Sequence, residues 1–264
     1  MNKLKLLFLA SVALALNACE KVIDIDLKNT KPVIVIEGNV IDEYVAQKVK
    51  ISQTKPFTED NSVDAVTNAT ITLKDVTLNK TYDFSASDAE GNYFSEKFKG
   101  MPGHVYELKV KSDNQEYVAQ STMPIKVPLD SLSITEVSFF GNTRKYLKVN
   151  FADPANYQNQ YRYVIRVNNA LVKGYYVDSD RFNNGKYIAN TIFTDEPELK
   201  TGDTIKVEFQ CIDMNIYRYF FAISQISGNG GPPTAPSNPD SNFNNGALGF
   251  FSAHTSQTNT AVIK

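Results

Sequence analysis

The sequence predicts a mainly β protein in two parts, an N-terminal antiparallel β-sandwich and a C-terminal β-rich α+β domain with one substantial helix. Three observations predict this fold class. Apolar and polar residues alternate with period two through residues 22–126, as in strands with one buried face. Turn clusters rich in Gly, Pro, Asn and Asp separate these runs. Only one segment, which begins near residue 215, has the apolar spacing of a helix.

The first element along the chain is a leader, residues 1–18, with the order of a bacterial lipoprotein signal peptide. Its apolar run ends at Leu16 and is too short to span a bilayer, which takes about 20 residues. Cleavage before Cys19 places Leu16 at position −3, where a lipobox accepts it. We therefore expect a Cys19 that carries diacylglycerol and an acylated amine, followed by a lipidated tether over residues 19–31. A soluble secreted protein and an uncleaved anchor are the alternatives.

The residues that follow Cys19 indicate the membrane to which the lipoprotein is sorted. Glu20 follows it, and the Asp that commonly retains lipoproteins at the inner membrane is absent from that position. We therefore expect a lipid anchor in the cell outer membrane. Asp24 and Asp26 resemble a surface-export signal diluted by apolar residues, so surface and periplasmic orientations both stay open. The two carboxylates favour a solvated tether over a recognition element.

Composition excludes several classes of protein. The 264 residues are 42% hydrophobic and 21% charged, which is typical of globular chains. Lys3 and Lys5 leave with the leader, so the mature chain is net acidic, which argues against nucleic-acid binding. Two Cys and two His exclude a disulfide scaffold and leave little material for a metal site, and we expect no cofactor. Cys211 lies in an apolar strand pattern and is predicted to be a small buried residue.

The N-terminal domain is predicted over residues 32–126. Short alternating runs are spaced as in immunoglobulin-like or transthyretin-like sandwiches of about 100 residues. The predicted strands include residues 32–38, 45–52, 69–73, 81–84, 105–111 and 116–122. Ser112 to Gln115 reads as a hairpin turn between the last two strands.

The C-terminal domain is predicted over residues 127–264, after a connection stiffened by Pro124 and Pro128. Strands are expected within residues 132–140, 145–151, 161–168 and 204–211. The helix is expected at about 215–226, with Asp213 or Asn215 as its N-cap. A Pro/Gly loop, residues 228–242, is too rich in breakers for a regular element and is therefore either disordered or functional. An apolar core strand is expected at residues 246–254.

Several segments together carry a family resemblance. The segments are the lipobox, Val22–Asp26, the strand Val33–Gly38, Tyr117–Pro124, and a tail made of Pro236–Pro239 and Gly246–His254. In their order and spacing they resemble the Bacteroidota lipoprotein family called domain of unknown function 4249. The resemblance covers essentially the whole chain. It implies an outer-membrane lipoprotein commonly encoded beside TonB-dependent receptors, and it supplies no catalytic residue.

Catalytic patterns are weak in this sequence. His104 and His254 lack the spacing of a zinc protease motif and are expected to be a turn residue and a hydrogen-bonded structural residue. A triad built on Ser252 and His254 lacks the usual nucleophile elbow. The segment that begins at Asp178 departs from a calcium loop, because Phe and Asn occupy required positions, and a polar hairpin tip is the better interpretation.

Aromatic residues and the Pro/Gly loop are the better candidates for contacts. Eight tyrosines lie within residues 157–219 of the second domain, where a tyrosine either fills a strand face or binds a ligand or partner. They are Tyr157, Tyr161, Tyr163, Tyr175, Tyr176, Tyr187, Tyr217 and Tyr219. In and after the loop, the candidate partner or ligand contacts are Pro232, Pro233, Pro236, Asn238, Pro239 and Phe243.

These observations predict a non-enzymatic outer-membrane lipoprotein that acts as an accessory or ligand-binding component beside a TonB-dependent transporter. Its expected partners are outer-membrane lipid, through acylated Cys19, and a TonB-dependent receptor. The alternative is an envelope-anchored hydrolase acting on glycan or peptide, with Asp195, Glu196 and Glu198 for acid-base work. Solvated loop charge is the default interpretation of those three residues.

Overall fold

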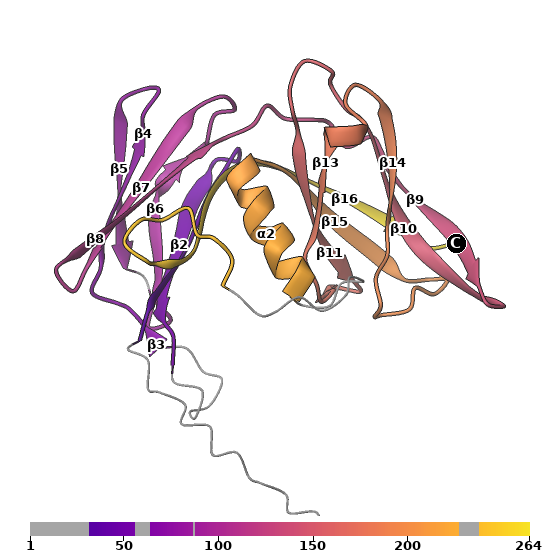
Figure 1. Cartoon of the computed structure of the whole chain (residues 1–264), viewed down its shortest axis with the longest axis horizontal. Helices are drawn as coiled ribbons and strands as arrows, with labels where there is room; N and C mark the ends of the chain where they lie inside the picture. The colour runs from indigo at the N-terminus through magenta and orange to yellow at the C-terminus, as the bar shows by residue number, and fades with distance from the viewer. Residues whose placement is uncertain (1–31, 56–63, 87, 227–237) are drawn as a thin grey trace, which may run out of the picture. The chain divides into compact units, whose positions relative to one another are not determined.

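A computed structural model of the protein describes residues 32–55, 64–86, 88–226 and 238–264 (Figure 1). The predicted leader, Cys19, Asp24 and Asp26 lie outside these residues. The strands of the N-terminal part are β1 (Ile34–Ile41), β2 (Val45–Gln53), β3 (Asp64–Ala65), β4 (Thr70–Asp75), β5 (Lys80–Ala86), β6 (Asn92–Phe98), β7 (Val105–Ser112) and β8 (Gln115–Thr122). Buried and less buried residues alternate along them, as in β4 and β8, so the period-two pattern identified these strands correctly.

The predicted N-terminal sandwich is confirmed, and its two sheets share strand β5. Lys80–Asp83 of β5 pairs with β4, and Phe84–Ala86 pairs with β6. Strands β1 and β2 extend the sheet of β6, strands β7 and β8 extend the sheet of β4, and every pair among β1–β8 is antiparallel. The predicted hairpin between β7 and β8 turns through Asp113 (φ 48°) and Asn114 (φ 62°), as a type I′ turn requires. Apolar residues from both sheets, such as Ile36 and Leu108, form the core of the N-terminal sandwich.

The C-terminal part holds a second sandwich. Its elements are β9 (Ser131–Phe139), β10 (Asn142–Ala152), β11 (Gln160–Val167), β12 (Ala170–Leu171), β13 (Tyr176–Ser179), the 3-10 helix η1 (Asp180–Phe182), β14 (Tyr187–Ile192), β15 (Thr204–Ile212), α2 (Met214–Ile226) and β16 (Leu248–Val262). Strands β14, β10 and β9 form a three-stranded sheet. It packs on β11, β15 and β16 around a core in which the Tyr161 ring lies 4.7 Å from Phe151 and 5.2 Å from Phe209.

Strand β16 joins the two sandwiches, a feature that the sequence did not indicate. Leu248–His254 pairs with β1 in parallel, and Thr255–Val262 pairs with β15 antiparallel. The strand predicted to end at His254 therefore continues to Val262, through a run of polar residues from Thr255 to Thr260. Through β16, strands from both parts belong to one mixed sheet of 13 strands in the described chain.

A polar junction forms where β16 changes partner. Asp42, just past the end of β1, accepts the backbone N–H of Ser256 at 2.7 Å. The ammonium group of Lys126 lies 2.9 Å from Asp42 and donates to the carbonyl of Ser256 at 2.7 Å. The proline-bounded connection between the predicted domains is thereby fixed to β16, and the backbone N–H and C=O of Ser256 both have partners.

Helix α2 begins one residue before its predicted start and is the only α-helix in the described part of the chain. Asp213 is its N-cap, because its carboxylate accepts the N–H of Ile216 at 3.0 Å. Ile216 and Phe220 are buried against Phe250 of β16, as the helical spacing predicted, whereas Ile226 at the end of that stripe is exposed. No helix in the described ranges is long and apolar enough to cross a membrane.

Candidate functional site

A candidate site with aromatic walls is a depression between α2, β13 and the end of β14, which we call the aromatic groove. Its volume is about 300 Å³. Figure 1 shows β13 between α2 and β14, and the groove runs along this strand. The side chains that give it its chemistry are Tyr175, Tyr176, Asp178, Asn190, Phe193 and Phe221. Pockets that hold small ligands begin at about this size and combine apolar walls with a few polar groups.

Strand β13 carries the groove because it is an edge strand. In the described residues it pairs with β11 alone, in the register Tyr163↔Tyr176 and Tyr161↔Asp178. Since side chains of a strand alternate between faces, Tyr176 and Asp178 point to the sandwich interior near β14. Val177 points the other way and packs with the α2 cluster. The groove therefore reaches around the free edge of the sheet.

The aromatic walls are exposed but held in place by neighbouring rings. Phe193, 64% exposed, contacts the Tyr146 ring at a centroid distance of 5.0 Å. Phe221, 46% exposed, stacks on Tyr217 at 5.7 Å. Such ring pairs restrict side-chain motion, so the apolar surface is available to a ligand at a reduced entropic cost.

The wall that α2 provides is fixed from below by Arg162 of β11. Its guanidinium lies 3.8 Å from the centroid of the buried Phe220 ring, within the range of a cation–π contact, and donates to the Gln210 side chain at 3.3 Å. Burial lowers the pKa of Arg162 to about 10, so the group stays charged at neutral pH. Tyr175 stacks on the same Phe220 ring at 5.8 Å.

Asp178 supplies the groove with a carboxylate. One oxygen accepts the side-chain amide of Asn190 at 3.0 Å, and the other accepts the N–H of Ser179 at 2.8 Å. Burial, with the charge of Asp180 as a smaller cause, raises the pKa of Asp178. Among the described residues no Lys, Arg or His forms an ion pair with it. The carboxylate is thus partly desolvated and balanced by neutral donors only.

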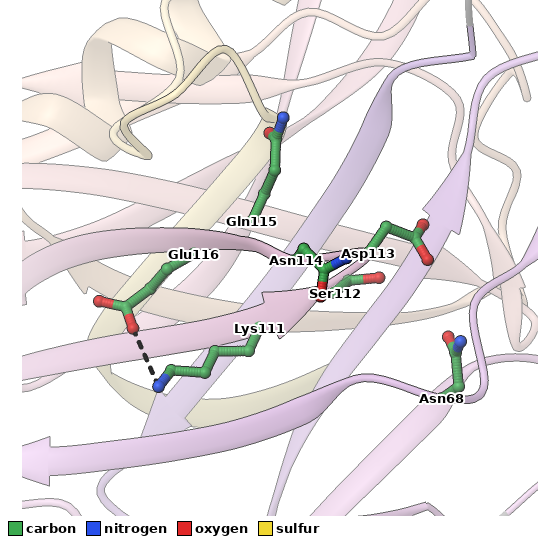
Figure 2. A pocket seen from close by; sticks show the side chains of 7 residues that line it. All are labelled: Asn68, Lys111, Ser112, Asp113, Asn114, Gln115 and Glu116. Atoms are coloured by element: carbon green, nitrogen blue, oxygen red, sulfur yellow. Dashed lines mark ion pairs between the residues drawn. The ribbon is translucent and has the colours of Figure 1, made fainter.

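A second depression, of about 390 Å³, surrounds the β7–β8 hairpin. Figure 2 shows Lys111 and Glu116 facing each other there, joined by an ion pair of 3.3 Å, with Asn68 approaching from another segment. The lining is polar throughout and contains no aromatic ring. Because Lys111 is already paired with Glu116 and the rest of the lining is polar, we regard it as a solvated hairpin surface.

The contacts predicted around the Pro/Gly loop fall into three groups. Pro232, Pro233 and Pro236 lie outside the described residues. Asn238 is exposed and Pro239 partly so, and they stay predictions. Phe243 was wrongly assigned to a contact surface: it is 7% exposed, belongs to the core of the N-terminal sandwich and forms a bridge with Ala119 of β8.

The Ser252–His254 pair considered for a catalytic triad is present, but it lies in the protein interior. Ser252 and His254 lie two residues apart on one face of β16, with the hydroxyl 3.0 Å from Nδ1, and both are 2% exposed. Burial and the charge of Arg162 lower the pKa of His254 to about 4. The prediction of a structural histidine is confirmed.

The remaining predicted residues have structural surroundings. His104 follows a turn and lies 2.8 Å from the buried carboxylate of Asp75. Cys211 is a buried free thiol, as predicted, and burial raises its pKa. The segment after Asp178 forms η1 and a turn, and in the described ranges no three His, Cys, Asp or Glu side chains are grouped to hold a metal ion.

Tyr175 and Tyr176 of the groove were among the tyrosines predicted from the sequence, whereas Phe193, Phe221 and Asn190 were not. Phe221 follows the apolar stripe of α2 by one residue, on a side that the helical period assigns to solvent. Phe193 precedes a polar, acidic loop. Large aromatic residues at positions where burial is not expected were the signal that could have found both.

Comparison with protein families supports the resemblance noted in the sequence. The chain matches the profile "Domain of unknown function (DUF4249)" over residues 20–260. A search of curated proteins found no match. Because the matched range covers both sandwiches, α2 and nearly all of β16, the protein belongs to the DUF4249 family.

Proposed function

We propose that the protein is a non-enzymatic outer-membrane lipoprotein that serves as an accessory or ligand-binding component beside a TonB-dependent transporter. Acylated Cys19 fixes the chain to the leaflet, and residues 20–31 act as a tether. More than one acyl chain makes such anchoring effectively permanent, because one chain alone binds a membrane only marginally. The folded domains then act by contact with a ligand or a neighbouring protein.

The observation that supports a binding role most directly is the aromatic groove. It combines exposed, preorganised rings with one partly desolvated carboxylate, and Phe193 and Phe221 leave apolar surface open to solvent. Exposed apolar surface of this kind is usually kept for recognition, since it otherwise favours aggregation.

The hydrolase alternative has less support. Asp195, Glu196 and Glu198 are all exposed in the loop between β14 and β15, and none of them lines the aromatic groove. A general acid needs a pKa raised toward neutral pH, which burial normally provides. The Ser252–His254 pair is enclosed by protein, so a substrate has no direct approach to it.

Affinity purification from native outer membranes tests the proposal. The wild-type lipoprotein should fractionate with the outer membrane and co-elute with a β-barrel transporter, while the variant Cys19→Ser should move to the soluble fraction. Mass analysis of the mature N-terminus should find an acylated cysteine. An unmodified N-terminus, or repeated purification without any β-barrel protein, would overturn the proposal.

A further inference from the structure

The free edge of β13 and the chemistry of the aromatic groove point to a specific class of ligand. We propose that the groove binds a peptide segment in extended conformation, which adds a strand to β13 and places a Lys or Arg side chain against Asp178. This deepens the proposed function, on which it rests, by naming what the binding component recognises.

The backbone of β13 turns the N–H and C=O of one residue away from β11, toward the groove. Asp180 donates its N–H to the carbonyl of Asn159 at 3.0 Å, which fixes the hydrogen-bonding parity of the β11–β13 pair. In an antiparallel pair, alternate residues point their N–H and C=O groups at the partner strand. Asp178 and Asp180 point theirs at β11, so the N–H and C=O of Val177, which lies between Asp178 and Tyr176, point away from β11 and toward the groove. A strand edge of this kind is a template for another extended chain.

The walls fit an added strand. On one side of the edge, Phe221, Ser224 and Gln225 come from α2, and on the other, Asn190 and Phe193 come from β14 and its end. Side chains of an extended peptide point alternately to opposite faces. One set would therefore meet Phe221 on the helix, and the other would meet Asp178, Tyr176 and Phe193.

The carboxylates beside the groove favour a cationic side chain in the bound peptide. In the described part of the chain, Asp178 has only neutral donors as partners. Burial and, as a smaller cause, the charge of Asp195 raise the pKa of Tyr176, so a second carboxylate adds negative charge near the groove. Asp180 adds a third carboxylate, whose charge, besides burial, also raises the pKa of Asp178. In the β11–β13 register Arg162 lies opposite Val177, so its side chain is on the other face of the sheet from Asp178, and its guanidinium lies on the Phe220 ring. A cationic side chain gains from the carboxylate and from the faces of the aromatic rings.

The test measures binding of short synthetic peptides to the full acylated chain in detergent, by fluorescence anisotropy. The probe is an eight-residue alternating Thr/Val peptide with one central Lys, compared with the same peptide carrying norleucine or Glu. We expect the Lys peptide to bind about tenfold more tightly than the norleucine peptide, which corresponds to about 1.4 kcal/mol. The Glu peptide should bind more weakly than both.

Variants separate the two parts of the proposal. Asp178→Asn keeps an acceptor for Asn190 and should abolish the preference for Lys, whereas Asp83→Asn, at an exposed position of β5, should leave it unchanged. Phe221→Ala should weaken the Lys and norleucine peptides equally. Methylation of alternate peptide nitrogens should weaken binding to the wild-type chain at least tenfold if a strand is added. Thermal unfolding of each variant confirms that it is folded.

Several outcomes would overturn the inference. Full competition by n-butylamine together with tight binding of the N-methylated peptide would show a site for small cations only. A dimer in sedimentation that Phe221→Ala abolishes would show that a second copy of the chain occupies the groove. If the peptides fail to bind while a transporter still co-purifies, the peptide proposal alone fails. If they bind without any transporter, the transporter partnership alone fails.

Discussion

At the scale of single residues, polar side chains of β16 and the neighbouring strand β15 form a hydrogen-bonded network. Glu208 accepts hydrogen bonds from Gln210 at 2.7 Å and from Ser256 at 3.0 Å, on the same sheet as Arg162 and His254. Buried polar groups stabilise only when each is satisfied, since an unpaired one costs about 1–3 kcal/mol. Substitutions of Glu208, Ser256 or His254, which do not line the aromatic groove, should therefore act on stability and leave the groove intact.

His254 gives this network a dependence on pH. Its pKa is about 4 in the folded chain against an ordinary 6.5, so between these values the unfolded chain binds the proton more readily. The free energy of unfolding should therefore fall as the pH falls from 6.5 toward 4, by about 1.4 kcal/mol for each unit of pKa depression. His254→Gln should flatten that slope in urea titrations at pH 7, 6 and 5. Equal slopes for the wild type and the variant would contradict the assignment.

Cys211 should be unreactive in the folded protein. It is 2% exposed, its sulfur accepts the N–H of Val127 at 3.4 Å, and burial raises its pKa, so little thiolate is present near neutral pH. With Cys19 acylated, a thiol reagent should label no cysteine in buffer and one in denaturant. Rapid labelling without denaturant would show that Cys211 is accessible.

At the scale of elements, the start of α2 is tied to the N-terminal sandwich. The carboxylate of Asp213 caps the helix and also accepts the Ser121 hydroxyl and, at 3.3 Å, the N–H of Thr122 in β8. Asp213→Ala should lower the free energy of unfolding by about 1–2 kcal/mol, with Asp213→Asn, which keeps a capping oxygen, as its control. Chemical denaturation checks both, and equal losses in the two variants would contradict the capping role.

The β1–β16 pair depends on a glycine. A Cβ at Gly249 would lie 2.1 Å from the carbonyl oxygen of Ile36, and its φ is +91°. Gly249→Ala should therefore cost about 2–4 kcal/mol, since the backbone of one strand must move. Gly246→Ala has a similar φ of +73° but meets no atom within 4 Å, so it should cost only about 1 kcal/mol. Comparable losses for the two variants would show that the close approach is unimportant.

At the scale of the whole molecule, β16 should make the two sandwiches unfold together. One strand pairs with β1 in its first half and with β15 in its second. Amides of Ile36 in β1 and Val207 in β15 should therefore exchange through openings of the same free energy, and Gly249→Ala should reduce protection at both. Loss of protection in β1 with none in β15 would mean that the sandwiches are energetically independent.

The elements that depend on local sequence patterns were predicted correctly. Period-two runs located the strands of the first sandwich, and helical spacing with a capping Asp213 located α2. The joining role of β16 was missed, because pairing between residues 35 and 248 leaves no signal in either segment alone. The groove was missed for the same reason: Asp178, Phe193 and Phe221 meet only after β13 is placed at a sheet edge beside α2. Phe243 was misjudged because a polar neighbourhood concealed a core residue.

Site-specific photo-crosslinking in native outer membranes tests the central claim, that the aromatic groove is the contact site of a lipid-anchored binding component. Benzophenone side chains at positions 193 and 221 report on the groove, and one at Tyr44, which is 71% exposed on the N-terminal sandwich, serves as the control. We predict crosslinked products from positions 193 and 221 and none from position 44. Crosslinking at position 44 alone, or at none of the three, would contradict the account.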